Sequence, residues 1–169
     1  QINDISLLNK PTQVWFTKLD WAGAEEVEGA VCVLMDEDGK VLTDSFGNEV
    51  RWISGKEPKK LVGILEAGKT YRYHEEAAPE GYGYSEDVVF TVSEDGTIDR
   101  VVMEDKPTTC YFSKQDFGGT EIPGAVCELE TFKENGKREV ISQWVSGTVP
   151  HKIEGILSPG KTYYFHEKE

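Results

Sequence analysis

The chain has 169 residues and a net charge of −13, from 18 basic and 31 acidic side chains, which argues against nucleic acid and anionic membranes as partners because both repel an acidic surface. Its hydrophobic content of 38% and aromatic content of 11% exclude a disordered acidic tail and suffice for packed cores. The longest unbroken apolar run, Ala30 to Met35, has six residues and is therefore too short for membrane insertion.

Short β-strands are predicted along the chain, because apolar residues alternate with period two in several segments. In chain order, these segments are residues 14–18, 30–34, 71–75 and 88–92. The turn sequences at 36–39 and 94–97 indicate hairpins. No stretch of ten or more residues carries a helical stripe, so the predicted fold is all-β, with one β-sandwich in each repeated unit.

The sequence contains an internal repeat, which decides how the chain is divided. Trp52–Gly55 recurs as Trp144–Gly147 at an offset of 92 residues, and Gly29–Cys32 recurs as Gly124–Cys127 at an offset of 95. The other matched pairs are Phe16–Lys18 with Phe112–Lys114, Gly63–Leu65 with Gly155–Leu157, Gly68–Tyr71 with Gly160–Tyr163, and Asn9–Thr12 with Asp105–Thr108.

The predicted domain boundaries follow from this repeat. Residues 1–11 are expected to be the last strand of a preceding repeat, and residues 12–107 a complete repeat. Residues 108–169 are expected to be a second repeat that lacks its C-terminal strands, so that the chain is either a window from a longer array or a deliberate truncation. The short linker at 106–109 predicts sandwiches arranged end to end, as in a rod.

Ionisable side chains interrupt the apolar faces of two predicted strands. Lys18 and Glu75 occupy positions at which the alternation places inward-facing side chains, and the second unit repeats both as Lys114 and Glu167. Such charges form a buried ion pair or reach water at strand ends, because an unpaired buried charge costs several kcal/mol. Alternatively, a lysine amine buried among aromatic groups acts as a nucleophile, a buried glutamate shuttles protons, and a neighbouring Asp or Asn is the electrophile.

Several ordered motifs resemble the B-type repeats of Gram-positive surface proteins, the CnaB or SpaA-type pilin domains. They are Phe16–Asp20, Gly29–Ala30, Trp52–Gly55, Gly68–Tyr71, Glu75–Tyr82 and Glu104–Pro107. The resemblance implies an Ig-like, prealbumin-like sandwich that forms a spontaneous isopeptide bond between Lys and Asn or Asp, assisted by an acidic residue. It implies that Lys18 is the nucleophile, Asp105 the acceptor and Glu75 the proton shuttle.

The second unit departs from this pattern. Lys114 and Glu167 are present there, but no acceptor follows them, whereas Asn9 is an acceptor that no lysine precedes. Two hypotheses follow. Either these residues are orphaned by the boundaries of the chain, or the first strand of one molecule completes the second unit of another, so that Lys114 bonds to Asn9 between chains.

These inferences predict a structural stalk module of a Gram-positive pilus or adhesin, extracellular and anchored to the cell wall through regions outside this chain. The bond forms once per molecule, so the chain is not a turnover enzyme and needs no cofactor. The expected partners are neighbouring repeats, other pilin subunits or a host surface ligand. Two alternatives remain: a ligand-binding adhesin module for a host protein or glycan, and a split ligation module in which Lys114 and Glu167 accept a strand carrying Asn or Asp in trans.

Cysteine, histidine and tryptophan residues give further expectations. Cys110 and Cys127 point into one predicted core, which allows either a disulfide or two buried free thiols. The three histidines lack the spacing of metal ligands, so no metal site is predicted. Trp15 points away from the core face, where it either packs on a neighbouring unit or binds a sugar or protein.

Overall fold

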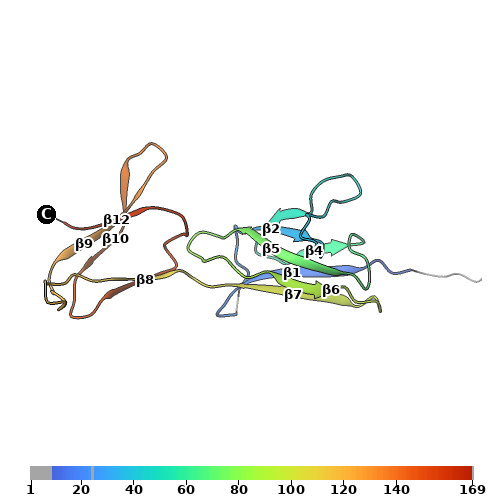
Figure 1. The fold of residues 1–169 in the computed structure, drawn as a ribbon, viewed down its shortest axis with the longest axis horizontal. Coiled ribbons are helices and arrows are strands. Elements are labelled where there is room, and N and C mark those ends of the chain that lie inside the picture. Colours follow the sequence, from blue (N-terminus) through green and yellow to red (C-terminus); the bar gives the residue numbers. More distant parts are fainter. Residues whose placement is uncertain (1–8, 24, 169) are drawn as a thin grey trace, which may run out of the picture. The chain divides into compact units, whose positions relative to one another are not determined.

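The computed structural model describes residues 9–23 and 25–168, which form two compact units. The first unit takes in the described residues up to 79 together with 83–106, and the second takes in 80–82 together with those from 107 onward. Every regular element is a strand, and none of the described residues lies in a helix (Figure 1). The predicted all-β class is therefore confirmed, whereas most of the predicted strand at 1–11 lies outside the described residues.

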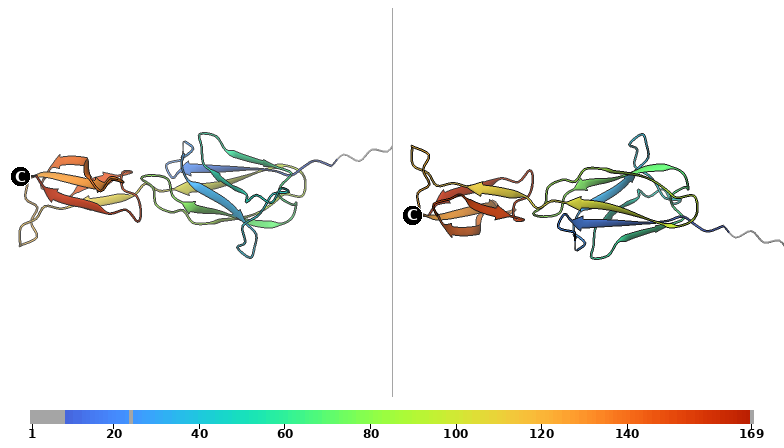
Figure 2. Two further views of the ribbon diagram at one scale, coloured as in Figure 1. Left: turned by 90° about the horizontal axis from the view of Figure 1, so that it is seen from above. Right: turned by 90° about the horizontal axis from the view of Figure 1, so that it is seen from below.

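The first unit is a sandwich of two sheets that face each other (Figure 2). Its strands are β1 (Gln13–Asp20), β2 (Val31–Met35), β3 (Arg51–Ile53), β4 (Lys59–Val62), β5 (Thr70–Ala77), β6 (Val88–Thr91) and β7 (Ile98–Asp105). One sheet has the order β4-β1-β7 and the other has the order β3-β2-β5-β6. β1 pairs antiparallel with β4 and parallel with β7, so the first and last strands of the unit are neighbours (Figure 1).

Aromatic side chains fill the space between the two sheets. The Phe16 ring on β1 packs edge-on against the Tyr73 ring on β5, with 5.2 Å between the ring centroids. Trp52 on β3 stacks on Tyr73 at 5.5 Å. The predicted alternation is confirmed on both strands, because the residues that it places inward on β1 and β5, including Lys18 and Glu75, are buried.

The two predicted hairpin turns have different outcomes. Asp36–Gly39 closes a tight hairpin, in which the Asp36 N–H donates to the Lys40 carbonyl at 2.9 Å. The prediction of a hairpin at residues 94–97 is wrong, because β6 and β7 on either side of this turn belong to different sheets. Alternation defines which side chains face inward, but it does not define which strand becomes the neighbour.

The repeated motifs contact one another in the same way in both units. The Ala30 N–H donates to Ser54 Oγ at 2.9 Å, and the Ser54 N–H donates back to the Ala30 carbonyl at 2.9 Å. Ala125 and Ser146 form the same pair in the second unit, at 2.9 and 2.8 Å. The Gly-Ala-Val-Cys and Trp-x-Ser-Gly motifs therefore recur together because each satisfies backbone groups of the other.

The second unit has fewer strand pairings than the first. Its strands are β8 (Thr109–Phe112), β9 (Val126–Phe132), β10 (Arg138–Val145), β11 (His151–Glu154) and β12 (Tyr163–Glu167). They form one sheet with the order β10-β9-β12 and another with β11-β8. Among the described strands, β8 pairs only with β11 and β12 only with β9, whereas their counterparts β1 and β5 have two partners each.

Candidate functional site

A buried lysine lies between two carboxyl groups inside the first unit. Lys18 comes from β1 and Asp105 from the neighbouring strand β7, while Glu75 comes from β5 of the opposite sheet. Lys18 Nζ lies 2.9 Å from Glu75 Oε1 and contacts Asp105 Oδ1. The exposed fraction is 1% for the Lys18 side chain and 0% for the two carboxyl side chains, so all three groups are shielded from water.

The parallel pairing of β1 with β7 explains why these residues meet. Lys18 lies opposite Met103 in the register, and Asp105 is two residues further along the same strand. Because residues two apart on a strand share a face, Met103 and Asp105 both point into the core. The structure thus brings together the three residues to which the family resemblance assigned roles.

The charges in this cluster do not balance when all three groups are ionised. One lysine amine faces two carboxyl groups, and burial makes an uncompensated charge costly. Asp105 Oδ2 has no hydrogen-bond partner among the described residues, and Glu75 Oε1 has its ion contact with Lys18 but no well-aligned hydrogen bond. Among the described residues, Asp105 Oδ2 is consequently a buried carboxyl oxygen without a hydrogen-bond partner.

Ser85 also belongs to this cluster, although the sequence did not point to it. Its backbone N–H donates to Glu75 Oε2 at 2.8 Å, and its Oγ accepts a hydrogen bond from Lys18 Nζ at 3.0 Å. Its Oγ also lies within hydrogen-bond distance of the Glu104 carbonyl, at 2.7 Å, and contacts Asp105 Oδ1. The second copy of the repeat ends before the matching position, so no recurrence marked this residue.

Glu26 fixes the backbone of the lysine. Its Oε2 accepts a hydrogen bond from the Lys18 N–H at 2.8 Å, and Glu121 does the same for the Lys114 N–H at 3.2 Å. Burial raises the pKa of Glu26 above its ordinary value. The two glutamates match at an offset of 95 residues, so the repeat contained a signal that could have identified them.

Cys32 and Tyr73 close the site on the side of the core. Cys32 Sγ lies 3.4 Å from the Tyr73 hydroxyl, and both side chains are fully buried. Burial raises the pKa of the Cys32 thiol and that of the Tyr73 phenol. Both groups therefore stay neutral near pH 7, and they surround the lysine on this side without adding charge to the site.

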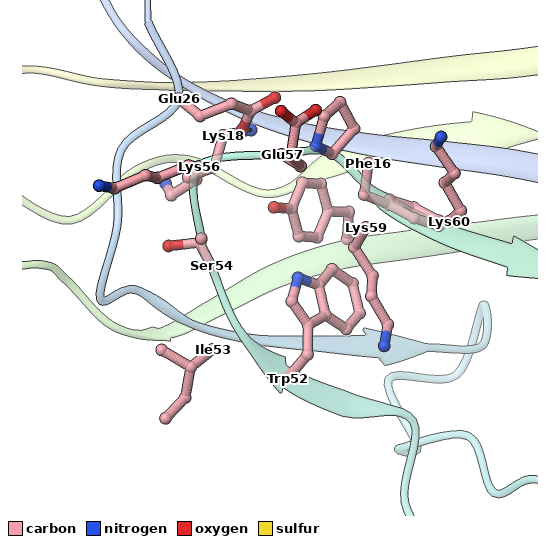
Figure 3. Close-up of a pocket in the computed structure, with 13 residues that line it drawn as sticks. Phe16, Lys18, Glu26, Trp52, Ile53, Ser54, Lys56, Glu57, Lys59 and Lys60 are labelled. Carbon is pink, nitrogen blue, oxygen red and sulfur yellow. Dashed lines mark hydrogen bonds between the residues drawn. The ribbon is translucent and has the colours of Figure 1, made fainter.

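An open pocket of about 540 Å³ lies next to the site. It is bounded by β1, β3 and the segment that leads into β4, and Lys18 and Tyr73 form part of its wall. Figure 3 shows Lys18 beside Glu26 at one end of the pocket and Trp52 at the other. Lys18 therefore forms part of the wall of a pocket that opens to solvent, although its side chain is buried.

The corresponding pair in the second unit is open to water. Lys114 Nζ lies 3.3 Å from Glu167 Oε2, and these side chains are 32% and 52% exposed. No Asp or Asn side chain of the described residues contacts Lys114. Asn9 is exposed and lies outside any strand. The second unit thus pairs Lys114 with Glu167, and no described Asp or Asn completes a cluster like that of the first unit.

The cysteines of the second unit are free thiols. Cys127 on β9 is buried and Cys110 on β8 is half-buried. The disulfide that the sequence allowed between them is not formed in the structure. Burial raises the pKa of the Cys127 thiol, which keeps it in the unreactive protonated form.

Trp15 packs within its own unit. Its ring lies on the outer face of the β4-β1-β7 sheet, 4.2 Å from Lys60 Nζ and 4.5 Å from Arg100 Cζ, measured to the ring centroid. Lys60 and Arg100 are its register partners on β4 and β7. The outward tryptophan is therefore explained by two cation–π contacts, and neither a ligand nor a neighbouring unit is needed to account for it.

An ion-pair network lies on the second unit. His166 Nε2 lies 3.5 Å from Glu130 Oε1 and 3.8 Å from Glu128 Oε2, and the described residues contain no other group of His, Cys, Asp and Glu side chains close enough to share a metal ion. Lys168 and Arg138 also pair with these carboxylates, at 2.9 and 3.3 Å. Because both carboxylates have cationic partners, ion pairing accounts for the network.

The sandwich and its buried lysine cluster define a class of all-β domains. The family described as the SpaA prealbumin-like fold domain matches residues 12–107, which is more than half of the chain. The chain belongs to this family of SpaA or CnaB-type pilin domains, as its motifs predicted. No curated protein matches the sequence.

Solved structures with a similar fold include the following three proteins. The Bacillus anthracis TIE protein has a TM-score of 0.52 and 24% identity, over 95% of this chain and 29% of its own. BcpA, the major pilin subunit of Bacillus cereus, has a TM-score of 0.51 and 23% identity, and the match covers 59% of this chain and 31% of BcpA. A streptococcal ancillary pilin has a TM-score of 0.51 and 18% identity, and the match covers 95% of this chain and 54% of the pilin. This chain therefore spans about a third to a half of each of these proteins.

Proposed function

We propose that this chain is a shaft module of a Gram-positive pilus or surface adhesin, stiffened by an isopeptide bond between Lys18 and Asp105. Glu75 is the proton shuttle. The observation that carries the proposal is the contact of one amine with two carboxyl groups at 0–1% exposure, joining the first and last strands of one sheet. A buried ion pair alone would need only one of these carboxyl groups.

The proposed reaction is a condensation. The Lys18 ammonium first gives one proton to the Asp105 carboxylate, and the neutral amine then attacks Asp105 Cγ. Glu75 takes a second proton from Nζ and passes it to the protonated carboxyl oxygen, which leaves as water. Glu75 Oε1, 2.9 Å from Nζ, is placed to take the proton. Within the described part of the chain, Asp105 Oδ2 has no hydrogen-bond partner that would oppose its departure. The products are one amide and one water, and no cofactor takes part.

The position of the bond suits a load-bearing module. Tension that enters at residue 12 reaches Lys18 along β1, crosses the bond to Asp105 and leaves at residue 107. The 87-residue separation between the bonded residues is thus removed from the force path. By the chain-entropy argument used for disulfides, closing such a loop also stabilises the unit by roughly 4–5 kcal/mol.

The wider assignment is also part of this proposal. Residues 12–107 form the complete repeat, between a strand of a preceding repeat at 1–11 and a second repeat from 108, with the repeats end to end. The module acts at the cell surface, its partners are neighbouring repeats and other pilin subunits, and its chemistry occurs once. BcpA and the streptococcal ancillary pilin, which share the fold, are named as pilins, which supports this role. Among the described residues, no helix is long and apolar enough to cross a membrane.

Intact mass measured in denaturant tests the bond. The wild-type chain is expected to weigh one water, about 18 Da, less than its sequence mass, as amide condensation requires. Lys18→Ala and Glu75→Gln are expected to have their full masses, and fragmentation of the wild-type protein should give a branched peptide that joins Lys18 to Asp105. A full mass for the wild-type chain would refute the proposal.

A second candidate function is that the second unit accepts a strand in trans. Lys114 is half-buried and its partner Glu167 is exposed. Among the described strands, β8 and β12 each have one neighbour where β1 and β5 have two. A synthetic peptide with the sequence of residues 98–107 is expected to form a covalent adduct with the wild-type chain and none with Lys114→Ala. A denatured dimer without peptide would instead assign the acceptor to Asn9 of another molecule. If neither the adduct nor the dimer forms, this second function is excluded.

A further inference from the structure

We propose that Ser85 is a fourth functional residue of the bond-forming site. Its hydroxyl supports the acceptor carboxyl group during attack, and its backbone N–H holds the proton shuttle. This inference rests on the proposed isopeptide reaction and adds to it a residue that the sequence motifs do not contain. The Lys18, Glu75 and Asp105 side chains all contact Ser85.

The backbone and the hydroxyl group of Ser85 contact different members of the site. The Ser85 N–H binds Glu75 Oε2 at 2.8 Å and thereby turns Oε1 toward Lys18 Nζ, which lies 2.9 Å away. The Ser85 Oγ accepts a hydrogen bond from Nζ at 3.0 Å and contacts Asp105 Oδ1. The amine therefore has one oxygen to which it can pass a proton and another that orients it toward the acceptor.

The single hydroxyl proton of Ser85 has two acceptors within reach. One is the Glu104 carbonyl at 2.7 Å, and the other is Asp105 Oδ1. As Nζ attacks Cγ, negative charge grows on the oxygen that stays on the carbon, and the Ser85 O–H can turn toward it without any heavy atom moving. A donor that is already in place stabilises such charge because no reorganisation is needed. Ser85 keeps its proton throughout, and the oxygen that leaves is Oδ2.

The loop that carries Ser85 is held on both sides of this residue. On one side, the Gly83 N–H donates to the Lys106 carbonyl at 2.9 Å, next to Asp105. On the other side, Asp87 pairs with Arg72 at 3.1 Å and with His74 at 2.6 Å, both on β5. These contacts attach the loop to the strands that carry the acceptor and the shuttle. The hydroxyl is therefore fixed relative to the reacting groups.

The rate of bond formation tests this role. Wild-type and Ser85→Ala chains are made in a short cell-free synthesis pulse, quenched in acid at intervals, and scored by intact mass for the loss of one water. Removal of the hydroxyl is expected to slow the reaction about 100-fold, the lower end of the effect of removing one oxyanion donor. Ser85→Thr keeps a hydroxyl and is expected to recover most of the rate.

Two controls separate a chemical role from a structural one. Ser93→Ala removes another Ser–Asp hydrogen bond of the same unit, that with Asp99, and is expected to react at the wild-type rate. Ser85→Ala in a Glu75→Gln background measures the stability cost without the bond, which should be small. A wild-type rate for Ser85→Ala would overturn the role of Ser85 and leave the bond intact. A slow variant that Thr does not rescue and that unfolds easily would also overturn it, whereas no water loss in the wild-type chain would overturn both proposals.

Discussion

Lys18 and Asp105 are 87 residues apart in the chain, yet they contact each other between two parallel neighbouring strands. Parallel neighbours cannot be joined by a short turn, so the whole sandwich is the connection between them. A covalent link at this place would tie together the two strands through which the unit is joined to the rest of the chain. Stability, mechanics and reactivity of the first unit should consequently all depend on the same few side chains.

The charge imbalance around Lys18 predicts a stability difference between two variants that both lack the bond. Lys18→Met leaves the Glu75 and Asp105 carboxyl groups buried without a cation, whereas Glu75→Gln leaves one amine with one carboxyl group. The Met variant is expected to be less stable by about 3 kcal/mol, the lower end of the cost of breaking a buried ion pair. Urea denaturation measures the difference. Equal stabilities would mean that the carboxyl groups do not depend on Lys18, and Lys18→Met/Asp105→Asn should recover part of the loss.

Mechanical stretching gives the second prediction. When the wild-type chain is pulled from attachment points at residues 12 and 107, the first unit is expected to show no unfolding step, because the proposed bond would bypass the residues between Lys18 and Asp105. Lys18→Ala should unfold in one step that releases about 30 nm, from 87 residues at roughly 3.4 Å each. A single-molecule force measurement decides between the two, and a full-length step in the wild-type chain would contradict the force path.

The faces of the strands could be predicted from the sequence, and so could two members of the site. Alternation with period two placed Lys18 and Glu75 inward because each strand has one buried face. The role of Asp105 came from the family resemblance, since nothing in local periodicity indicates that β7 returns to lie parallel to β1. The same limit explains the wrong hairpin at residues 94–97, where the chain crosses between sheets.

Other residues of the site could not be recognised from local patterns. Ser85 lies in a loop, where no periodicity applies, and its contacts depend on three strands that meet only in the folded unit. Glu26 had a repeated counterpart in Glu121, but an acidic residue in an acidic chain does not stand out without knowledge of its partner. Trp15 was recognised as outward-facing, whereas its cationic neighbours depended on the register of β4 and β7.

The raised pKa of Glu26 predicts how acidity affects the first unit. Burial makes ionisation of Glu26 harder in the folded state, so the ionised carboxylate opposes folding above the raised pKa, and this cost disappears as the pH falls toward the ordinary value near 4.5. Glu26→Gln keeps an oxygen for the Lys18 N–H and removes the charge. The variant is therefore expected to be more stable than the wild type at pH 7, with the gain shrinking on acidification.

Glu121 in the second unit is a control for Glu26, because its pKa is lowered and not raised. A hydrogen bond from Ser113 is the largest of the effects that lower its pKa. Its carboxylate therefore contributes stability that is present above the ordinary pKa and is lost as the pH falls through the lowered value. Glu121→Gln is expected to lose stability at pH 7 and to match the wild type in acid. Thermal unfolding from pH 3 to pH 8 measures the stability of both variants. If both substitutions change the stability at pH 7 in the same direction, these assignments are contradicted.

The three thiols should report on the two units separately. Cys110 is half-buried and is expected to react first with a thiol reagent at pH 8, whereas burial and raised pKa values protect Cys32 and Cys127. One equivalent should react quickly, and Cys110→Ser should abolish that phase. In urea, Cys127 should become reactive before Cys32 in the wild-type chain, because the proposed bond would stabilise only the first unit. Glu75→Gln should expose Cys32 at a lower urea concentration, and no shift would contradict a bond that closes the sandwich around this thiol.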